Sequence, residues 1–280
     1  IALGVVEAVI MTVATALIGD YFEGAQREKW IALQVAVGSI AAIALIAIGG
    51  ALGDALGSRG PFLLYLLALP VVLAAALVLF EPVRQSQATE PGRSASVLSA
   101  IAPLVVTTLG IGVLFYTMIV QLGPILERSG AVSPGVIGMI GAGTNLGVAL
   151  GTIVFNRFKE KAGHTLLLAG LAIAAIGYAC TGLSSQLAVI SVFAVLTCIG
   201  SGILLPNMLA WTMRRLPTEQ RGRGMGLWTG AFFLGQFLAP LVIAGIQQAS
   251  GTMSNALLVY AGVAGVAAIG VAFIGSRKTV

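Results

Sequence analysis

The chain has 280 residues, of which 58% are hydrophobic and only 9% carry a charge. Soluble domains carry about a quarter charged residues, and one water-soluble core cannot hide this much apolar surface, so a soluble globular protein is excluded. The net charge of +5 does not indicate nucleic-acid binding, because the basic residues are spread over short polar segments and form no single patch.

Apolar runs long enough to cross a bilayer recur along the whole chain. A spanning helix needs about 20 apolar residues, and a helix satisfies its own backbone hydrogen bonds in lipid, which a lone strand cannot do. The sequence therefore predicts an all-α, multi-span membrane protein. Nine spans are expected, at residues 1–19, 30–52, 61–80, 100–124, 134–155, 165–183, 186–210, 224–247 and 254–275.

Residues 81–98 form the one long polar segment, and they contain two prolines. Such a segment is typical of a linker, so we expect three spans in residues 1–80 and a six-helix bundle in residues 99–280. Placing the linker in the cytoplasm puts thirteen of the fifteen Lys and Arg residues on the inner side. We therefore expect a multi-pass protein of the plasma (cell inner) membrane whose linker and C-terminus are cytoplasmic.

The first loop and the loop before the last two spans are weakly alike. One constant shift aligns Gln26-Arg27 with Gln220-Arg221 and Gly57 with Gly251. The chain also begins inside an apolar run. These observations predict that three spans precede residue 1, so that the N-terminal bundle is incomplete here and twelve spans form two parallel halves.

Several segments resemble the major facilitator superfamily, close to its drug-efflux-like branch. They are ALIGDYF at 16–22, NRFKEKAGH at 156–164, LPTEQRGRGMG at 216–226 and FFLGQFLAP at 232–240. The resemblance covers the whole chain, from the family's fourth helix to its twelfth. Asn156 stands where the family's loop signature usually has an aspartate, and only Gly49 and Gly50 match the antiporter signature of the fifth helix.

The resemblance implies a major facilitator fold and a cavity lined by the family's helices four, seven and ten. In this chain those helices correspond to the spans at 1–19, 100–124 and 186–210. It also implies cytoplasmic gating residues at the inner ends of the spans: Asp20, Arg27, Asn156, Arg157 and Arg221.

Glu7 is the only ionisable residue well inside a predicted span. It lies thirteen residues before Asp20, which at 1.5 Å per residue is about 20 Å along the helix. A carboxylate at that depth costs at least about 2.5 kcal/mol unless it is paired or hydrated. Glu7 is therefore the candidate for proton coupling or cation binding, unless it lies near the outer headgroups.

Other polar and aromatic side chains inside the spans are candidates for substrate contact. On the span at 100–124 a stripe runs through Gly110, Thr117, Gln121 and Pro124, with Tyr116 at its border. The alternatives are hydrogen bonds between helices and an interfacial aromatic belt. The substrate-binding or coupling candidates are Glu7, Tyr116, Thr117, Gln121, Asn145, Asn207, Trp211 and Gln236.

These features predict a secondary active transporter that moves a small solute by alternating access, proton-coupled, with efflux as its direction. The alternative is a membrane-embedded enzyme acting on a lipid or lipid-phosphate substrate. No phosphate-binding G-x-x-x-x-G-K-[ST] loop is present, and the single histidine, His164, lies in a basic loop. We expect no catalytic residues, metal or cofactor. The expected partners are a small-molecule substrate, membrane lipid and protons, and we expect a monomer.

Overall fold

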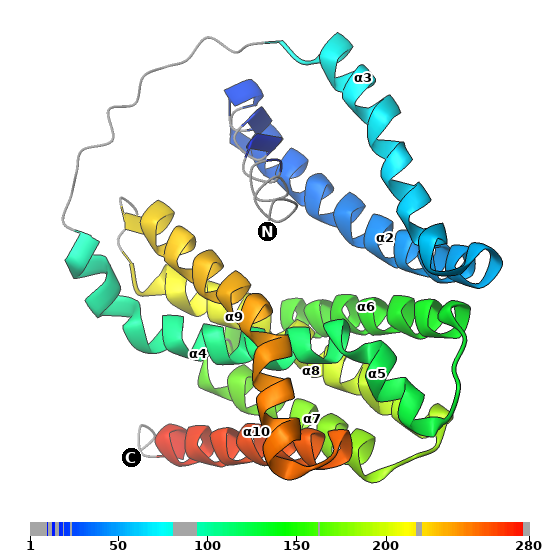
Figure 1. Cartoon of the computed structure of the whole chain (residues 1–280). Coiled ribbons are helices and arrows are strands. Elements are labelled where there is room, and N and C mark those ends of the chain that lie inside the picture. The colour runs from blue at the N-terminus through cyan, green and yellow to red at the C-terminus, as the bar shows by residue number, and fades with distance from the viewer. Residues whose placement is uncertain are drawn as a thin grey trace.

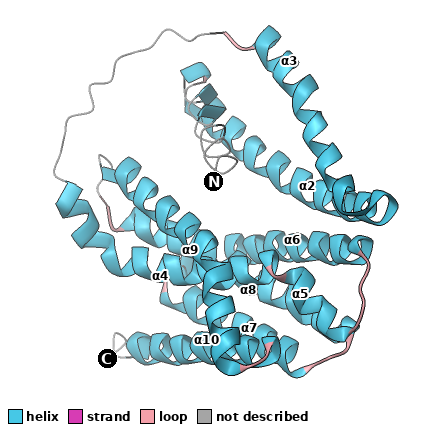
Figure 2. Cartoon of the chain, viewed as in Figure 1, coloured by secondary structure: helices cyan, strands magenta, loops and turns pink. Residues whose placement is uncertain are grey.

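A computed structural model describes residues 24–80, 94–161, 163–216 and 220–276, together with residues 10, 13, 14, 17, 18 and 20–22. Every long element in these ranges is a helix, and no strand occurs among them (Figure 2). The all-α, multi-span class predicted from the apolar runs is therefore confirmed. The predicted span at 1–19, with Glu7, lies for the most part outside the described residues.

The N-terminal group of helices folds back on itself. It comprises α2 (Gly24–Leu56), the 3₁₀ helix η1 (Gly57–Leu67) and α3 (Ala68–Val78). The chain reverses at Gly57, whose φ of +71° is accessible to glycine without strain. Gly60 then packs against the carbonyl oxygen of Leu52, where a Cβ would overlap that atom. The predicted span at 61–80 is thus a 3₁₀ helix followed by an α-helix, and Pro61, which lacks an N–H, lies inside the 3₁₀ part.

Six long helices follow the linker and form the second group (Figure 1). They are α4 (Ser94–Val120) with its short continuation α5 (Leu122–Leu126), α6 (Pro134–Arg157), α7 (His164–Leu183), α8 (Leu187–Arg214), α9 (Arg221–Ser250) and α10 (Met253–Ser276). Seven segments of the described chain are long and apolar enough to cross a membrane. One of them, Val37–Val78, turns back at Gly57 and so contains two of the predicted spans.

The span predicted at 100–124 differs from the structure at both of its ends. Helix α4 begins at Ser94, inside the predicted linker, and it ends at Val120 rather than continuing to residue 124. The break falls at Gln121, because Pro124 has no N–H to donate to the carbonyl four residues earlier. The stripe predicted along this span therefore does not continue unbroken to Pro124.

Close approaches at glycines hold the second group together. A Cβ added at Gly147 of α6 would lie 2.8 Å from the carbonyl oxygen of Val195 on α8, and Gly151 meets Gly202 of α8 in the same way. Small residues spaced every four positions on a membrane helix permit this close packing. On the neighbouring pair, a Cβ at Gly200 of α8 would lie 2.7 Å from the carbonyl oxygen of Gly170 on α7.

One arginine side chain caps the C-terminal end of α7. Arg128, in the 3₁₀ turn Glu127–Ser129 (η2), donates hydrogen bonds of 2.8 to 3.1 Å to the carbonyl oxygens of Thr181, Gly182 and Ser184. These carbonyls include the final ones of the helix, which have no partner within it. Burial lowers the pKa of Arg128 from its usual value, but an arginine in this position still carries its charge at neutral pH.

Candidate functional site

The two helix groups meet where the C-terminal half of α2 crosses the N-terminal half of α6. A Cβ added at Gly50 would lie 2.7 Å from Cα of Gly138, and a Cβ at Gly138 would lie 2.7 Å from Cα of Gly50. The side chain of Ile46 packs where a Cβ of Gly141 would stand, 3.0 Å away. The contact is therefore backbone against backbone, which only glycine permits at this distance.

A polar contact lies at the end of this crossing. The hydroxyl of Ser133 donates a 3.1 Å hydrogen bond to Oδ2 of Asp54. The same hydroxyl oxygen accepts from the backbone N–H of Val136 and caps the start of α6. The Asp54 carboxylate also lies over Gly135, where any Cβ would overlap it. The two groups are thus joined at this end by glycine contacts and one hydrogen bond between side chains.

The crossing is confined to one end of α2 and α6. The close approaches involve residues 46–54 of α2 and residues 133–141 of α6. Figure 1 shows α2 rising away from α6 toward its N-terminal end. The gating candidates Asn156 and Arg157 lie at the opposite end of α6, and both are exposed. In the orientation predicted from the basic residues, the joined ends face outward.

An aromatic cluster links α4 and α9. The ring of Phe232 lies 5.0 Å from that of Tyr116 and 5.8 Å from that of Phe115, and it stacks on Trp228 at 5.7 Å. Nε1 of Trp228 is buried and has no hydrogen-bond partner in the part of the chain that the structure describes. The helices cross beside this cluster, with Gly112 against the backbone of Phe232. Tyr116 thus belongs to an aromatic wall that the sequence stripe alone did not reveal.

Thr117 lies on a different face of α4. Its hydroxyl donates a 3.0 Å hydrogen bond to the hydroxyl of Tyr260 on α10, and both side chains are buried. The ring of Tyr260 packs 5.3 Å from that of Tyr178, whose hydroxyl donates to the carbonyl of Leu114. This network lies within the second helix group and joins α4, α7 and α10.

The two candidates on α8 both contact the loop between α6 and α7. The fully buried amide of Asn207 accepts from the N–H of Gly163 at 2.6 Å and donates to the carbonyl of Gly163 at 2.9 Å. Trp211 lies one turn further along, with its ring 4.5 Å from His164 and under the guanidinium of Arg215 at 5.8 Å. Asn207 therefore fixes the backbone of Gly163, whose φ of +120° favours glycine.

The remaining candidates are dispersed. Asn145 donates to the carbonyl of Gly141 in its own helix at 3.0 Å. Gln121 and Gln236 are half-buried, and Asp20 is exposed. The side chains of Arg27 and Arg221 and the whole of Glu7 lie outside what the structure describes. Within the described ranges, no group of His, Cys, Asp and Glu could hold a metal ion.

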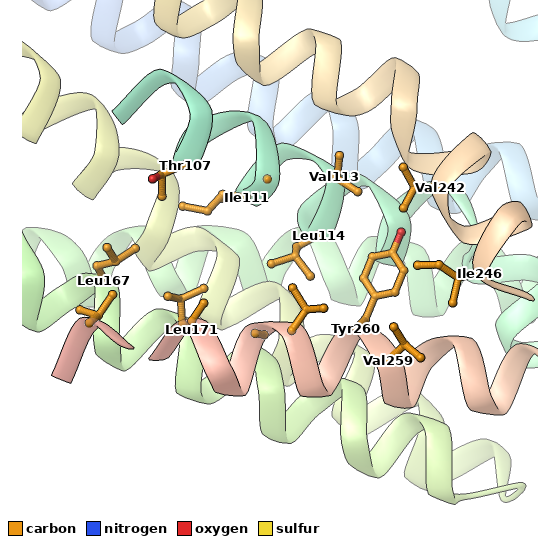
Figure 3. A pocket seen from close by; sticks show the side chains of 15 residues that line it. Thr107, Ile111, Val113, Leu114, Leu167, Leu171, Val242, Ile246, Val259 and Tyr260 are labelled. Atoms are coloured by element: carbon orange, nitrogen blue, oxygen red, sulfur yellow. The ribbon is translucent and has the colours of Figure 1, made fainter. Parts of the chain in front are cut away.

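A pocket of about 500 Å³ lies between α4, α7, α9 and α10 (Figure 3). Thr107 and Leu167 lie toward one end, and Val242, Ile246 and Val259 lie toward the other. The only hydroxyl groups on its walls are those of Thr107 and Tyr260. Neither this pocket nor the Asp54–Ser133 contact was predicted, although glycines spaced every three residues in 135–141 were a visible signal for close packing.

The described helices with their glycine-packed crossings define a multi-span membrane protein. The family model of the Major Facilitator Superfamily matches residues 1–130 and residues 104–279. The chain belongs to this superfamily, and it is a membrane transporter by family. No curated protein matches the chain at a significant level.

Solved structures support the same fold. The chain resembles a bacterial homologue of the human lysosomal transporter Spinster in its inward-facing, occupied conformation, with a TM-score of 0.71 and 18% identity over 94% of this chain and 73% of that one. The unoccupied inward-facing form gives a TM-score of 0.63 and 17% identity over 94% and 74% of the two chains. At this level of identity the likeness establishes the fold.

Proposed function

We propose that the protein is a secondary active transporter that moves a small solute by alternating access. The crossing of α2 and α6 is the observation that carries this proposal. Its two sides meet through close contacts between glycine backbones and one exposed hydrogen bond between side chains. Packed surfaces of this kind have discrete arrangements rather than a continuous range, which suits a contact that opens and closes as a unit.

The solute path runs between the two helix groups, on the side away from the crossing. The α4–α9 aromatic cluster supplies one wall, in which Trp228 stacks on Phe232. Gln121, Asn145 and Gln236 are further polar candidates for substrate contact. Thr117 and Asn207 serve the path indirectly, because their polar groups already bond to Tyr260 and Gly163.

Transport is coupled to protons through Glu7. The sequence supports this role, since Glu7 is the only carboxylate inside a predicted span and that span corresponds to a cavity-lining helix of the family. Alternating access would move the group between a hydrated setting and a drier one. Its proton affinity would then change within each cycle, as coupling requires.

The direction proposed is efflux, by a monomer in the plasma (cell inner) membrane with its linker and C-terminus in the cytoplasm. Likeness to the drug-efflux-like branch supports the direction, and the distribution of basic residues supports the orientation. In that orientation the α2–α6 crossing closes the outer side. The solved homologues of similar fold are described as inward-facing, which agrees with an outer side that is closed.

Transport in a defined membrane tests the proposal. The purified protein is reconstituted in liposomes that contain a pH-sensitive dye, and a panel of small organic solutes is tested, with ethidium as the first probe. An imposed pH gradient should drive movement of at least one solute together with protons, without ATP. Absence of gradient-driven movement for the whole panel, with a protein that melts cooperatively, would contradict the proposal.

A further inference from the structure

The pocket between α4, α7, α9 and α10 lies where two helix pairs fail to close on each other. Helix α4 packs extensively on α9, and α10 packs extensively on α7. Between these pairs, α4 and α10 make no comparable contact along their described lengths. A Cβ added at Gly110 of α4, which lines the pocket, would meet nothing within 4 Å.

The internal symmetry of the fold makes this opening notable. Each six-helix half of this superfamily contains two inverted three-helix repeats. Under that symmetry the packing of α7 on α8 has its counterpart in the packing of α10 on α4. The first pair is closed by Gly170 and Gly200, whose backbones nearly touch. The second pair, α10 and α4, has the pocket between its helices. An additional molecule in the pocket can take the place of the missing contact between them.

The walls of the pocket favour hydrocarbon over water. Both hydroxyl groups that line it are already bonded within the protein: Thr107 donates to the carbonyl of Pro103 at 2.7 Å, and Tyr260 accepts from Thr117 at 3.0 Å. The other lining residues are aliphatic or glycine. A buried water needs two or more polar partners, and these walls offer only two hydroxyl groups, each of which already makes one hydrogen bond within the protein.

The pocket has a buried floor and an exposed rim. On the floor, Ile111 is 2% exposed and Leu171 is 4% exposed, whereas on the rim Val263 is 58% exposed. Every lining residue falls within a segment long and apolar enough to span the membrane. The rim therefore opens sideways into the hydrocarbon of the bilayer.

The pocket is about as long as one acyl chain, and its lining on α10 occupies the middle of the span Met253–Phe273. Its lining on α10 runs from Val259 to Val271. Twelve residues at 1.5 Å per residue give about 18 Å along the helix. Half of a hydrocarbon core of about 30 Å is about 15 Å, which is the depth that one acyl chain occupies.

We propose that this pocket is an intramembrane binding site for one acyl chain of a bilayer phospholipid. The bound chain replaces the α4–α10 packing and separates the helix pair α4–α9 from the pair α7–α10. Because it lies within the second helix group, the site does not depend on the direction, substrate or coupling of transport. The occupant comes from the surrounding membrane and is not the transported solute.

Photocrosslinking measures the proposed occupancy. The full chain is reconstituted in liposomes of phosphatidylcholine that include a fraction carrying a diazirine on one acyl chain. After illumination, labelled peptides are mapped by mass spectrometry. Floor residues such as Ile111 and Leu171 should be labelled as well as the exposed Val266, which is 71% exposed and reports ordinary contact with lipid.

Filling the pocket supplies the matched comparison. Gly110→Leu places a side chain into the open space of the pocket, and Ala267→Leu narrows the pocket from the α10 side. Both should abolish labelling of the floor while leaving Val266 labelled. Gly262→Leu, also in open space but outside the lining, should leave floor labelling unchanged.

Three results would overturn the proposal. The first is an unlabelled floor in the unmodified protein when Val266 is labelled. The second is floor labelling that survives both filling variants. The third is floor labelling that appears only after the transported solute is added, since that outcome would assign the pocket to the solute and not to phospholipid.

Discussion

Replacing Asn207 by leucine tests whether this buried amide fixes the loop between α6 and α7. The variant Asn207→Leu keeps a similar volume but removes both hydrogen bonds to Gly163, which measure 2.6 and 2.9 Å. It leaves the N–H of Gly163, itself a buried residue, without that partner, whereas the carbonyl of Gly163 still accepts from the N–H of Leu167 at 3.0 Å. One unsatisfied buried group costs about 1–3 kcal/mol, so the variant should lose about that much stability.

The thermal melting of the detergent-solubilised protein measures this loss. A destabilisation of that size should lower Tm by roughly 2–12 °C for a chain of this length. Asn145→Leu is the matched control, because Asn145 donates only to a carbonyl of its own helix. That carbonyl keeps its backbone partner and no buried N–H is left unpaired, so the control should lower Tm by clearly less than Asn207→Leu does.

Two outcomes would refute this reasoning. One is an unchanged Tm for Asn207→Leu, which would mean that the Gly163 contact does not hold the loop. The other is an unchanged Tm with a raised KM for the transported solute, which would make Asn207 a direct substrate contact.

Three further predictions concern coupling, orientation and the end of α7. Glu7→Gln removes a titratable proton while keeping the size of the side chain, so proton-coupled transport in liposomes should be lost while the protein still folds; a normal rate with normal pH dependence would exclude coupling through Glu7. With the native cysteines removed, a cysteine at Ser250 should react with an impermeant thiol reagent on intact cells, and one at Ser86 should react only after permeabilisation; the reverse pattern would invert the topology. Arg128→Gln should lower the free energy of unfolding by about 1–3 kcal/mol, because the carbonyl oxygens at the C-terminal end of α7 lose the hydrogen bonds that Arg128 donates. An unchanged melting curve would contradict that capping role.

Much of the fold could be predicted because lipid imposes a length on each helix. The spans expected at 134–155, 165–183 and 254–275 correspond to α6, α7 and α10 within two residues at each end. These boundaries lie where the apolar runs end, and those ends can be read directly from the sequence. The 3₁₀ helix η1 was not predicted, because an apolar run has the same composition whether its helix is tight or regular.

The candidate site could be predicted only in part. Lipid and the protein interior are both apolar, so a membrane helix lacks the periodicity that marks the buried face of a soluble one. The site therefore had to be predicted from polar residues alone. A polar residue in a span does not show which neighbouring helix or cavity its side chain faces. Thr117 turned out to bond Tyr260 within its own group, and Asn207 bonds a loop. The pocket depends on which pairs of helices pack against each other, and this cannot be read from the sequence of any one segment.

The central claim is that the outer ends of α2 and α6 must separate during transport, and a reversible disulfide tests it most directly. Cysteines replacing Asp54 and Ser133, in a background without the native pair, should cross-link on mild oxidation, since the side chains they replace lie within hydrogen-bond distance. Gradient-driven transport in liposomes should then stop, and a reducing agent should restore it. Each single variant should transport equally with and without the oxidant. Undiminished transport by the fully cross-linked protein would contradict alternating access through this contact.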